Sequence, residues 1–130
     1  DRTLRRSHVN EQPARTWLNA LARAWQTKDA AAMAALFTED ASEQVDPFKT
    51  PIHGRENLRK GFAWWMKDQQ EIHISIGNVD VIGNRFYAEV DAAWVIASTG
   101  ERIQERGLLV CDMEGDRVGA IREFWKTRKG

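Results

Sequence analysis

One acidic residue in the N-terminal half stands in a setting that suits proton transfer. Asp46 lies between Val45 and Pro47, just after a segment that predicts a short strand. A carboxylate among apolar side chains has its charged form disfavoured, and its pKa rises toward a value useful for abstracting a proton. An Asp-Pro pair is also a common turn opener. Asp46 is therefore a candidate general base, with a solvated turn aspartate as the alternative.

Two further acids fall among apolar residues in the C-terminal half. Glu123 alternates with Ile121 and Trp125, and Glu105 lies between Ile103 and Gly107 in the same alternating pattern. A glutamate on an apolar strand face is either buried and functional or exposed on a face that is mixed in character. Glu105 could instead pair with an arginine on a neighbouring strand. Both remain candidates for binding or catalysis.

Other chemistries find little support. His8, His53 and His73 have no metal-ligand spacing, so neither a metal site nor a cofactor is expected. His53 precedes a predicted helix and could serve as an acid or base near neutral pH, or simply be solvated. The single cysteine, Cys111, alternates with apolar residues, which indicates a buried and inert thiol. A phosphate-binding glycine loop and a nucleophile elbow are both missing from the sequence.

The composition narrows the class of protein. The 130 residues carry 19 basic and 19 acidic side chains, so no charge surplus attracts nucleic acid or an anionic membrane. We expect one domain over residues 1–130, with residues 1–9 as a flexible arm. No apolar run approaches the length of a membrane span, and the charged N-terminus lacks a secretory signal. Cytoplasmic location is the expectation.

The elements that must position these residues follow from periodicity. Helical spacing predicts a first helix over about 11–27 with Asn10 as its cap, and a third over about 55–67 after Gly54. Between them, Asp29 caps a short second helix in which Met33, Leu36 and Phe37 share a face. After Gln70 the pattern alternates and predicts an antiparallel meander, with a bulge at Gly77 in its first strand.

The meander gives each strand an apolar face and a polar face. The long strand after Gly83-Asn84 directs Phe86, Ala88, Val90, Ala92 and Trp94 to one side. The next two strands place Glu105 and Leu109, then Ile121, Glu123 and Trp125, on corresponding faces. Helices followed by such a meander imply an α+β domain with the helices on one sheet face.

The order and spacing of these segments carry a family resemblance. Trp17 to Trp25, the segment Ala-Leu-Phe-Thr-Glu-Asp-Ala ending at Ala41, Asp46-Pro47 and the segment from His53 to Arg59 occur in that order. The chain thereby resembles SnoaL-like members of the nuclear transport factor 2-like superfamily, which includes ketosteroid isomerases and polyketide cyclases. The resemblance implies a cone-shaped, strongly curved mixed or antiparallel sheet around three helices, a cystatin-like α+β barrel with a cavity at its open end.

The resemblance also assigns roles. It makes Asp46 the general base, as in the isomerases. Glu123 or Glu105 is the substitute candidate for the protonated partner that polarises a carbonyl oxygen. The isomerases' own oxyanion donors correspond to Leu21 and Leu109 here, which is a departure from the isomerase pattern. A small apolar ligand would contact residues from the first and third helices, the turn before the latter, and the strands: Trp17, Leu21, Trp25, His53, Phe62, Val90, Trp94, Leu109, Ile121 and Trp125.

Two functions remain open on these grounds. One is cofactor-free proton transfer on an apolar carbonyl compound, as isomerisation, aldol-type cyclisation or dehydration; water activation by paired acids, as in the epoxide hydrolases of the superfamily, is a variant. The other is a non-catalytic binding or dimerisation module. The resemblance further implies a homodimer through the outer sheet face, where Glu89 or Asp91 could pair with Arg106, although a solvated face explains the same residues.

Overall fold

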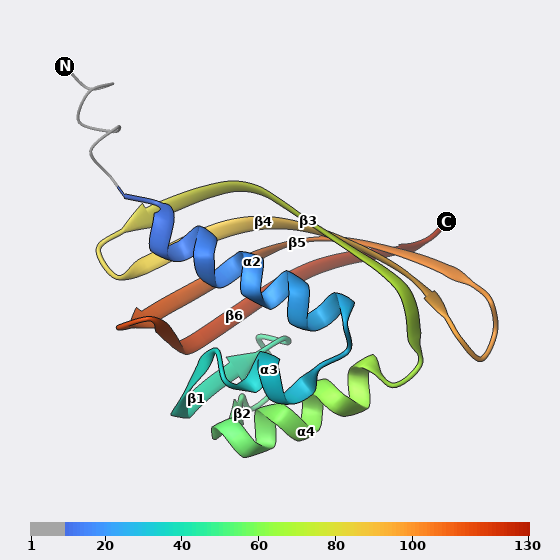
Figure 1. The fold of residues 1–130 in the computed structure, drawn as a ribbon, viewed down its shortest axis with the longest axis horizontal. Coiled ribbons are helices and arrows are strands. Elements are labelled where there is room, and N and C mark those ends of the chain that lie inside the picture. The colour runs from blue at the N-terminus through green and yellow to red at the C-terminus, as the bar shows by residue number, and fades with distance from the viewer. Residues whose placement is uncertain (1–9) are drawn as a thin grey trace.

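The computed structural model describes residues 10–130; the expected N-terminal arm and His8 lie outside this range. The chain order is helix, helix, two strands, helix and four long strands (Figure 1). The helices are α2 (Gln12–Gln26), α3 (Ala30–Ala34) and α4 (Arg55–Met66). The strands are β1 (Phe37–Gln44), β2 (Ile52–His53), β3 (Gln69–Ile82), β4 (Arg85–Ile96), β5 (Arg102–Glu114) and β6 (Arg117–Lys129).

Helix α2 follows its predicted apolar stripe. Trp17, Leu18, Leu21 and Trp25 are all buried on one side, and Pro13 is tolerated because the first turn needs no intrahelical N–H donor. The predicted cap is one residue off, because Glu11 occupies the N-cap position. Asn10 nevertheless satisfies an orphan donor of the first turn, since its Oδ1 accepts the Gln12 N–H at 2.9 Å.

The short second helix is confirmed, but its end was predicted too late. Asp29 caps α3 by accepting the Ala32 N–H at 2.9 Å, as expected from its type and place. The helix stops at Ala34, however, and Phe37 is the first residue of β1. Met33 and Phe37 still both point into the core, so burial alone could not distinguish a helical face from a helix followed by a strand.

The sheet is mixed, with the order β2-β1-β6-β5-β4-β3. Strands β3 to β6 form the predicted antiparallel meander, whereas β1 runs parallel to β6. The predicted alternation of β4 is confirmed: its even-numbered residues from Phe86 to Trp94 are buried. The pairing of β3 with β4 shifts between Ile76 and Val79, which agrees with an irregularity at Gly77.

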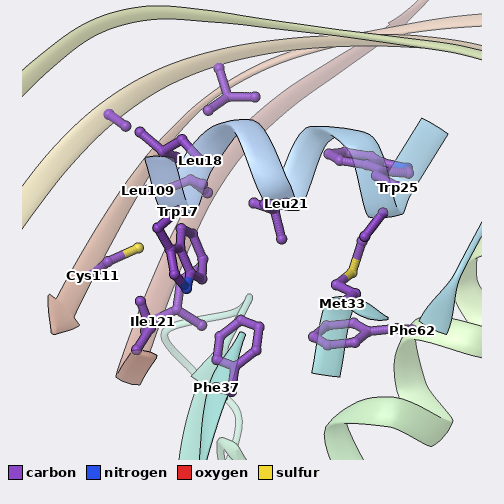
Figure 2. Close-up of a cluster of buried hydrophobic side chains, with 14 of the residues drawn as sticks. Trp17, Leu18, Leu21, Trp25, Met33, Phe37, Phe62, Leu109, Cys111 and Ile121 are labelled. Carbon is purple, nitrogen blue, oxygen red and sulfur yellow. The ribbon is translucent and has the colours of Figure 1, made fainter. Parts of the chain in front are cut away.

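The three helices lie on one side of the sheet, as an α+β architecture requires (Figure 1). Helix α2 packs on β3, while α4 packs on α3, β1 and β2. The core fills the space between, and Figure 2 shows Trp17 near the start of α2 and Trp25 near its end, with Leu21 between them. Among residues 10–130, no helix is long and apolar enough to cross a membrane.

Candidate functional site

A cavity of about 370 Å³ opens between the helices and the side of β1, β6 and β5 that faces them. Its lining is mainly apolar and aromatic, with three glutamates among the side chains. The residues come from α2 and α3, from β1 and the loop after it, from β2 and α4, and from β5 and β6: Leu21, Trp25, Met33, Phe37, Glu43, Val45, Ile52, Gly61, Phe62, Trp64, Trp65, Glu105, Leu109, Ile121, Glu123 and Trp125. Apolar walls with a few polar groups are typical of small-molecule sites.

Tryptophans form much of the wall. Trp25 is in ring contact with Trp65, Trp94 and Trp125, at centroid distances of 4.6, 6.1 and 6.1 Å. The ring of Trp125 is almost perpendicular to that of Trp25, at 87°. Edge-to-face contacts of this kind are favourable and hold each ring in a defined orientation. The wall is therefore rigid where α2, α4 and β6 meet.

Two of the glutamates form a coupled carboxyl pair. Glu43 lies opposite Ile121 in the parallel β1–β6 register, so its side chain falls beside that of Glu123. Burial, followed by the hydrogen bond to Glu123 and the negative charge of Glu123, together raise the pKa of Glu43 to about 10. Two adjacent carboxyls in an apolar site cannot both ionise cheaply. At neutral pH the pair therefore retains a proton, and we place it on Glu43.

The position of Glu123 is fixed by its neighbour on the same strand. The indole N–H of Trp125 donates to Glu123 Oε1 at 2.9 Å. Trp125 can reach over β5 because the residue paired with it there is Gly107. A Cβ at Gly107 would overlap the six-membered ring of Trp125, so only glycine leaves room for the ring. Gly107 thus helps to position Glu123 indirectly, because it leaves room for the Trp125 ring whose N–H binds Glu123.

Glu105 is the third acid, on β5. Its Oε2 accepts a hydrogen bond from Thr127 Oγ1 at 2.6 Å. Its Oε1 is buried and has no hydrogen-bond partner among the described residues. Burial raises the pKa of Glu105, the hydrogen bond from Thr127 lowers it, and the charge of Glu123 raises it further. An unpaired buried carboxyl oxygen is costly, so it marks a place where a ligand group would fit.

Most of the residues that the sequence singled out lie together in this wall. Glu105, Glu123 and six of the expected ligand contacts line the cavity: Leu21, Trp25, Phe62, Leu109, Ile121 and Trp125. The other four expected contacts are elsewhere. Trp17, Val90 and Trp94 belong to the buried core, and His53 is exposed at the end of β2. The Trp17 N–H is committed to Leu36 O at 2.7 Å and that of Trp25 to Gln69 Oε1 at 2.8 Å.

Asp46 is placed differently from the three glutamates. It follows β1 in a loop and is not among the residues that line the cavity. Its Oδ1 accepts the Phe48 N–H at 2.9 Å, and its side chain is 38% exposed, with Lys49 Nζ at 4.0 Å from Oδ2. This is the turn geometry expected of an aspartate that precedes a proline.

Glu43 is the site residue that sequence reasoning missed. It is only 9% exposed, an unusual burial for a glutamate. A signal was present, because Ala41, Glu43 and Val45 alternate with polar residues and extend one strand face toward the cavity. That signal is short and interrupted, since the β1–β6 register shifts between Phe37 and Ser42. Within residues 10–130, no cluster of histidine, cysteine and acidic residues is arranged to hold a metal ion.

Structures with the same fold include enzymes and ligand-binding proteins. An epoxide hydrolase/cyclase-like enzyme, SalBIII, with a role in pyran ring formation in the polyether salinomycin, is 20% identical, with a TM-score of 0.77 over 90% of this chain and 93% of that one. An LEH-like epoxide hydrolase from Mycobacterium tuberculosis is 17% identical, with a TM-score of 0.74 over 88% and 84%.

A third relative is a hypothetical protein with a ketosteroid isomerase-like fold from Catenulispora acidiphila, solved in complex with trimethylamine. It is 17% identical, with a TM-score of 0.74 over 83% of each chain. At such identities the likeness concerns the fold alone. No curated protein matches the sequence. Residues 18–125 match the SnoaL-like domain family, which is most of the chain. This protein is therefore a member of the SnoaL-like family, with the nuclear transport factor 2-like fold that the sequence predicted.

Proposed function

We propose that this protein is a cofactor-free enzyme that binds a small, largely apolar carbonyl compound and moves a proton on it. The observation that carries the proposal is the Glu43–Glu123 pair in the wall of an apolar cavity. One member of the pair holds a proton and the other carries a charge, so an acid and a base stand side by side. Isomerisation, aldol-type cyclisation and dehydration all need both.

In this mechanism Glu123 is the base. Its carboxylate removes a proton from the carbon next to the carbonyl, while Glu43 donates its proton or a hydrogen bond to the carbonyl oxygen on which charge develops. Trp125 keeps Glu123 Oε1 in place during the step. Glu105 is half-buried nearby, and its Oε1, which has no hydrogen-bond partner among residues 10–130, is available to a polar group of the substrate. The fold relatives named as an epoxide hydrolase and a cyclase-like enzyme support chemistry in this cavity.

Asp46 remains the competing candidate for the base. The two assignments differ in one measurable way: exchange of the α-proton for deuterium in D₂O, followed by NMR across a panel of cyclic and aromatic ketones. If Glu123 is the base, Glu123→Gln lowers the exchange rate by about 10²–10⁴-fold while Asp46→Asn stays near the wild-type rate. The reverse pattern would assign the reaction to Asp46.

A water-activating epoxide hydrolase is less well supported. That reaction, as the family performs it, uses an arginine between two aspartates. Among the described residues that line this cavity there are three glutamates and no lysine, arginine or histidine. A non-catalytic ligand-binding module is the second candidate, since the two leucines at the isomerases' donor positions, Leu21 and Leu109, line the cavity. It is favoured if no compound in the panel exchanges faster than in buffer.

The homodimer implied by the family belongs to the proposal as well. On the outer face of the sheet Leu108 and Phe124 are paired across β5 and β6 and are 37% and 42% exposed. The ion pair between Asp91 and Arg106, at 3.7 Å, lies on the same face. Light scattering after gel filtration should give twice the chain mass, and Leu108→Glu should shift it to the mass of one chain. A wild-type monomer would remove this part of the proposal.

A further inference from the structure

The described side chains that line the cavity include acidic groups but no basic ones, and this imbalance bears on the charge of its ligand. Three carboxyl groups line it, and the lining residues described here include no cationic side chain. The Glu43–Glu123 pair keeps one negative charge when it keeps one proton, and Glu105 adds a second when it is ionised. Negative charge in an apolar, half-closed space is expensive without a positive partner. Among residues 10–130, none of the side chains that line the cavity supplies such a partner.

The rest of the wall is suited to a cation. The rings of Trp65 and Trp125 are inclined to the ring of Trp25 by 49° and 87°. Trp64 and Phe62 extend the aromatic lining on α4. The face of an indole ring attracts positive charge, and several rings around one space are the usual means of binding alkylated ammonium groups.

One atom offers a specific contact. Glu105 Oε1 is buried, faces no donor among the described residues, and belongs to a side chain that Thr127 already holds through its other oxygen. The cationic residues next to Glu105 and Trp125 on these strands, Arg106 and Lys126, alternate to the outer face and are exposed. A positively charged ligand group would therefore complete the hydrogen bonding and the charge balance together.

We infer that the cavity selects a ligand with a cationic nitrogen: a small hydrophobic amine or alkylammonium group, held between the tryptophan faces and Glu105. This inference rests on the proposed function and narrows its substrate class to carbonyl compounds that carry a basic nitrogen. The Glu43–Glu123 pair remains the proton-transfer machinery, and Glu105 becomes the residue that determines specificity.

The test compares two ligands of the same shape. Choline and 3,3-dimethylbutan-1-ol differ in a charged nitrogen against a neutral carbon, and both dissolve in water. Calorimetric titration of the full chain at neutral pH and low salt should give an affinity for choline at least about tenfold above that for the alcohol. Glu105→Gln should lower the choline affinity severalfold and leave that for the alcohol unchanged. Glu39→Gln, which neutralises an exposed glutamate on β1, should change neither.

Three results would overturn the inference: equal or tighter binding of the alcohol, binding of neither ligand, or a choline preference that survives unchanged in Glu105→Gln. The infrared carbonyl band of a protonated carboxylic acid tests the proposed function separately. Its presence at neutral pH in the wild type and its loss in Glu43→Gln support the acid–base pair, whichever ligand binds. If the band is absent from the wild type, the proposed Glu43–Glu123 acid–base pair is ruled out, whereas the comparison of choline with the alcohol is unaffected.

Discussion

The two ends of helix α2 carry similar residues, but these residues lie in different environments. Near the start of the helix, Trp17 lies close to Phe37 (Figure 2) and is 2% exposed. Its ring centroid is 5.5 Å from that of Phe37 and 5.8 Å from that of Phe86, and its N–H donates to a backbone carbonyl. Near the end, Trp25 contacts three other tryptophans beside a cavity with three carboxyls. In the first cluster Phe37 also lines the cavity, but Trp17 and Phe86 are packed among protein atoms and do not. The second leaves space and polar groups that protein atoms do not fill.

The closed end should carry the larger share of the stability. Phe86 is 1% exposed, and Phe86→Ala would leave a cavity that the packed neighbours cannot close, at a cost of about 3–5 kcal/mol in the free energy of unfolding. Urea denaturation followed by far-UV circular dichroism measures this loss. A loss below about 1 kcal/mol would mean that this end is as loosely packed as the other.

The open end should give stability a pH dependence that the closed end lacks. Because the folded pKa of Glu43 is raised from 4.5 to about 10, the folded state binds more protons than the unfolded state between these values. Its contribution is full below about pH 4.5 and is lost as pH rises toward 10, at a maximum of about 1.4 kcal/mol per pH unit. Glu43→Gln should therefore gain stability relative to the wild type as pH rises from 5 to 8.

Denaturation midpoints at several pH values test this sign. Glu39→Gln is the matched control, since this exposed glutamate is on the same strand, and its curve should run parallel to the wild type. A Glu43→Gln curve that is also parallel would mean that Glu43 ionises normally in the folded protein. The two ends of α2 would then differ in packing and not in the ionisation of a buried acid.

The hydrogen bond from Trp125 to Glu123 can be weakened by a substitution on the neighbouring strand β5. Gly107→Ala would force the Trp125 ring away from β5 and weaken its hydrogen bond to Glu123, with an expected cost of about 1–3 kcal/mol. The fluorescence emission spectrum of the tryptophans and the affinity for choline should both change. Gly83→Ala, at a turn with a φ of 61° and no atom near the added methyl group, gives a loss of stability from strain alone and should leave the affinity unchanged.

The smallest effect is expected at the rim of the cavity. Trp64 is 78% exposed, so Trp64→Ala should change the free energy of unfolding by no more than about 0.5 kcal/mol. Because Trp64 also lines the cavity, the same substitution should weaken ligand binding. Thermal denaturation with and without choline separates the two quantities. A large loss of stability in Trp64→Ala would mean that the Trp64 side chain is packed as a core residue and does not lie at an exposed rim.

How far the sequence could predict this molecule depended on the range of the contacts. The face of β4 from Phe86 to Trp94 follows from alternation along one strand, and so does the inward direction of Glu105 and Glu123. Glu43 could not be found in this way. Its strand is short and irregular, and its partner is β6, the last strand in the chain order. Asp46, which the Asp-Pro pair singled out, lies in the loop after β1, and the acid of this region that lines the cavity is Glu43, three residues earlier.

The parallel pairing of β1 with β6 has a consequence for the order of folding. Glu43 and Glu123 are far apart in the chain, and their strands can pair only after the whole meander between them has been made. Contacts between such distant segments are slow to form, because the entropy of closing the loop is lost before the contact is gained. The α2–β3–β4 region can assemble from more local contacts. The acid pair is therefore expected among the last parts of the molecule to form as the chain leaves the ribosome.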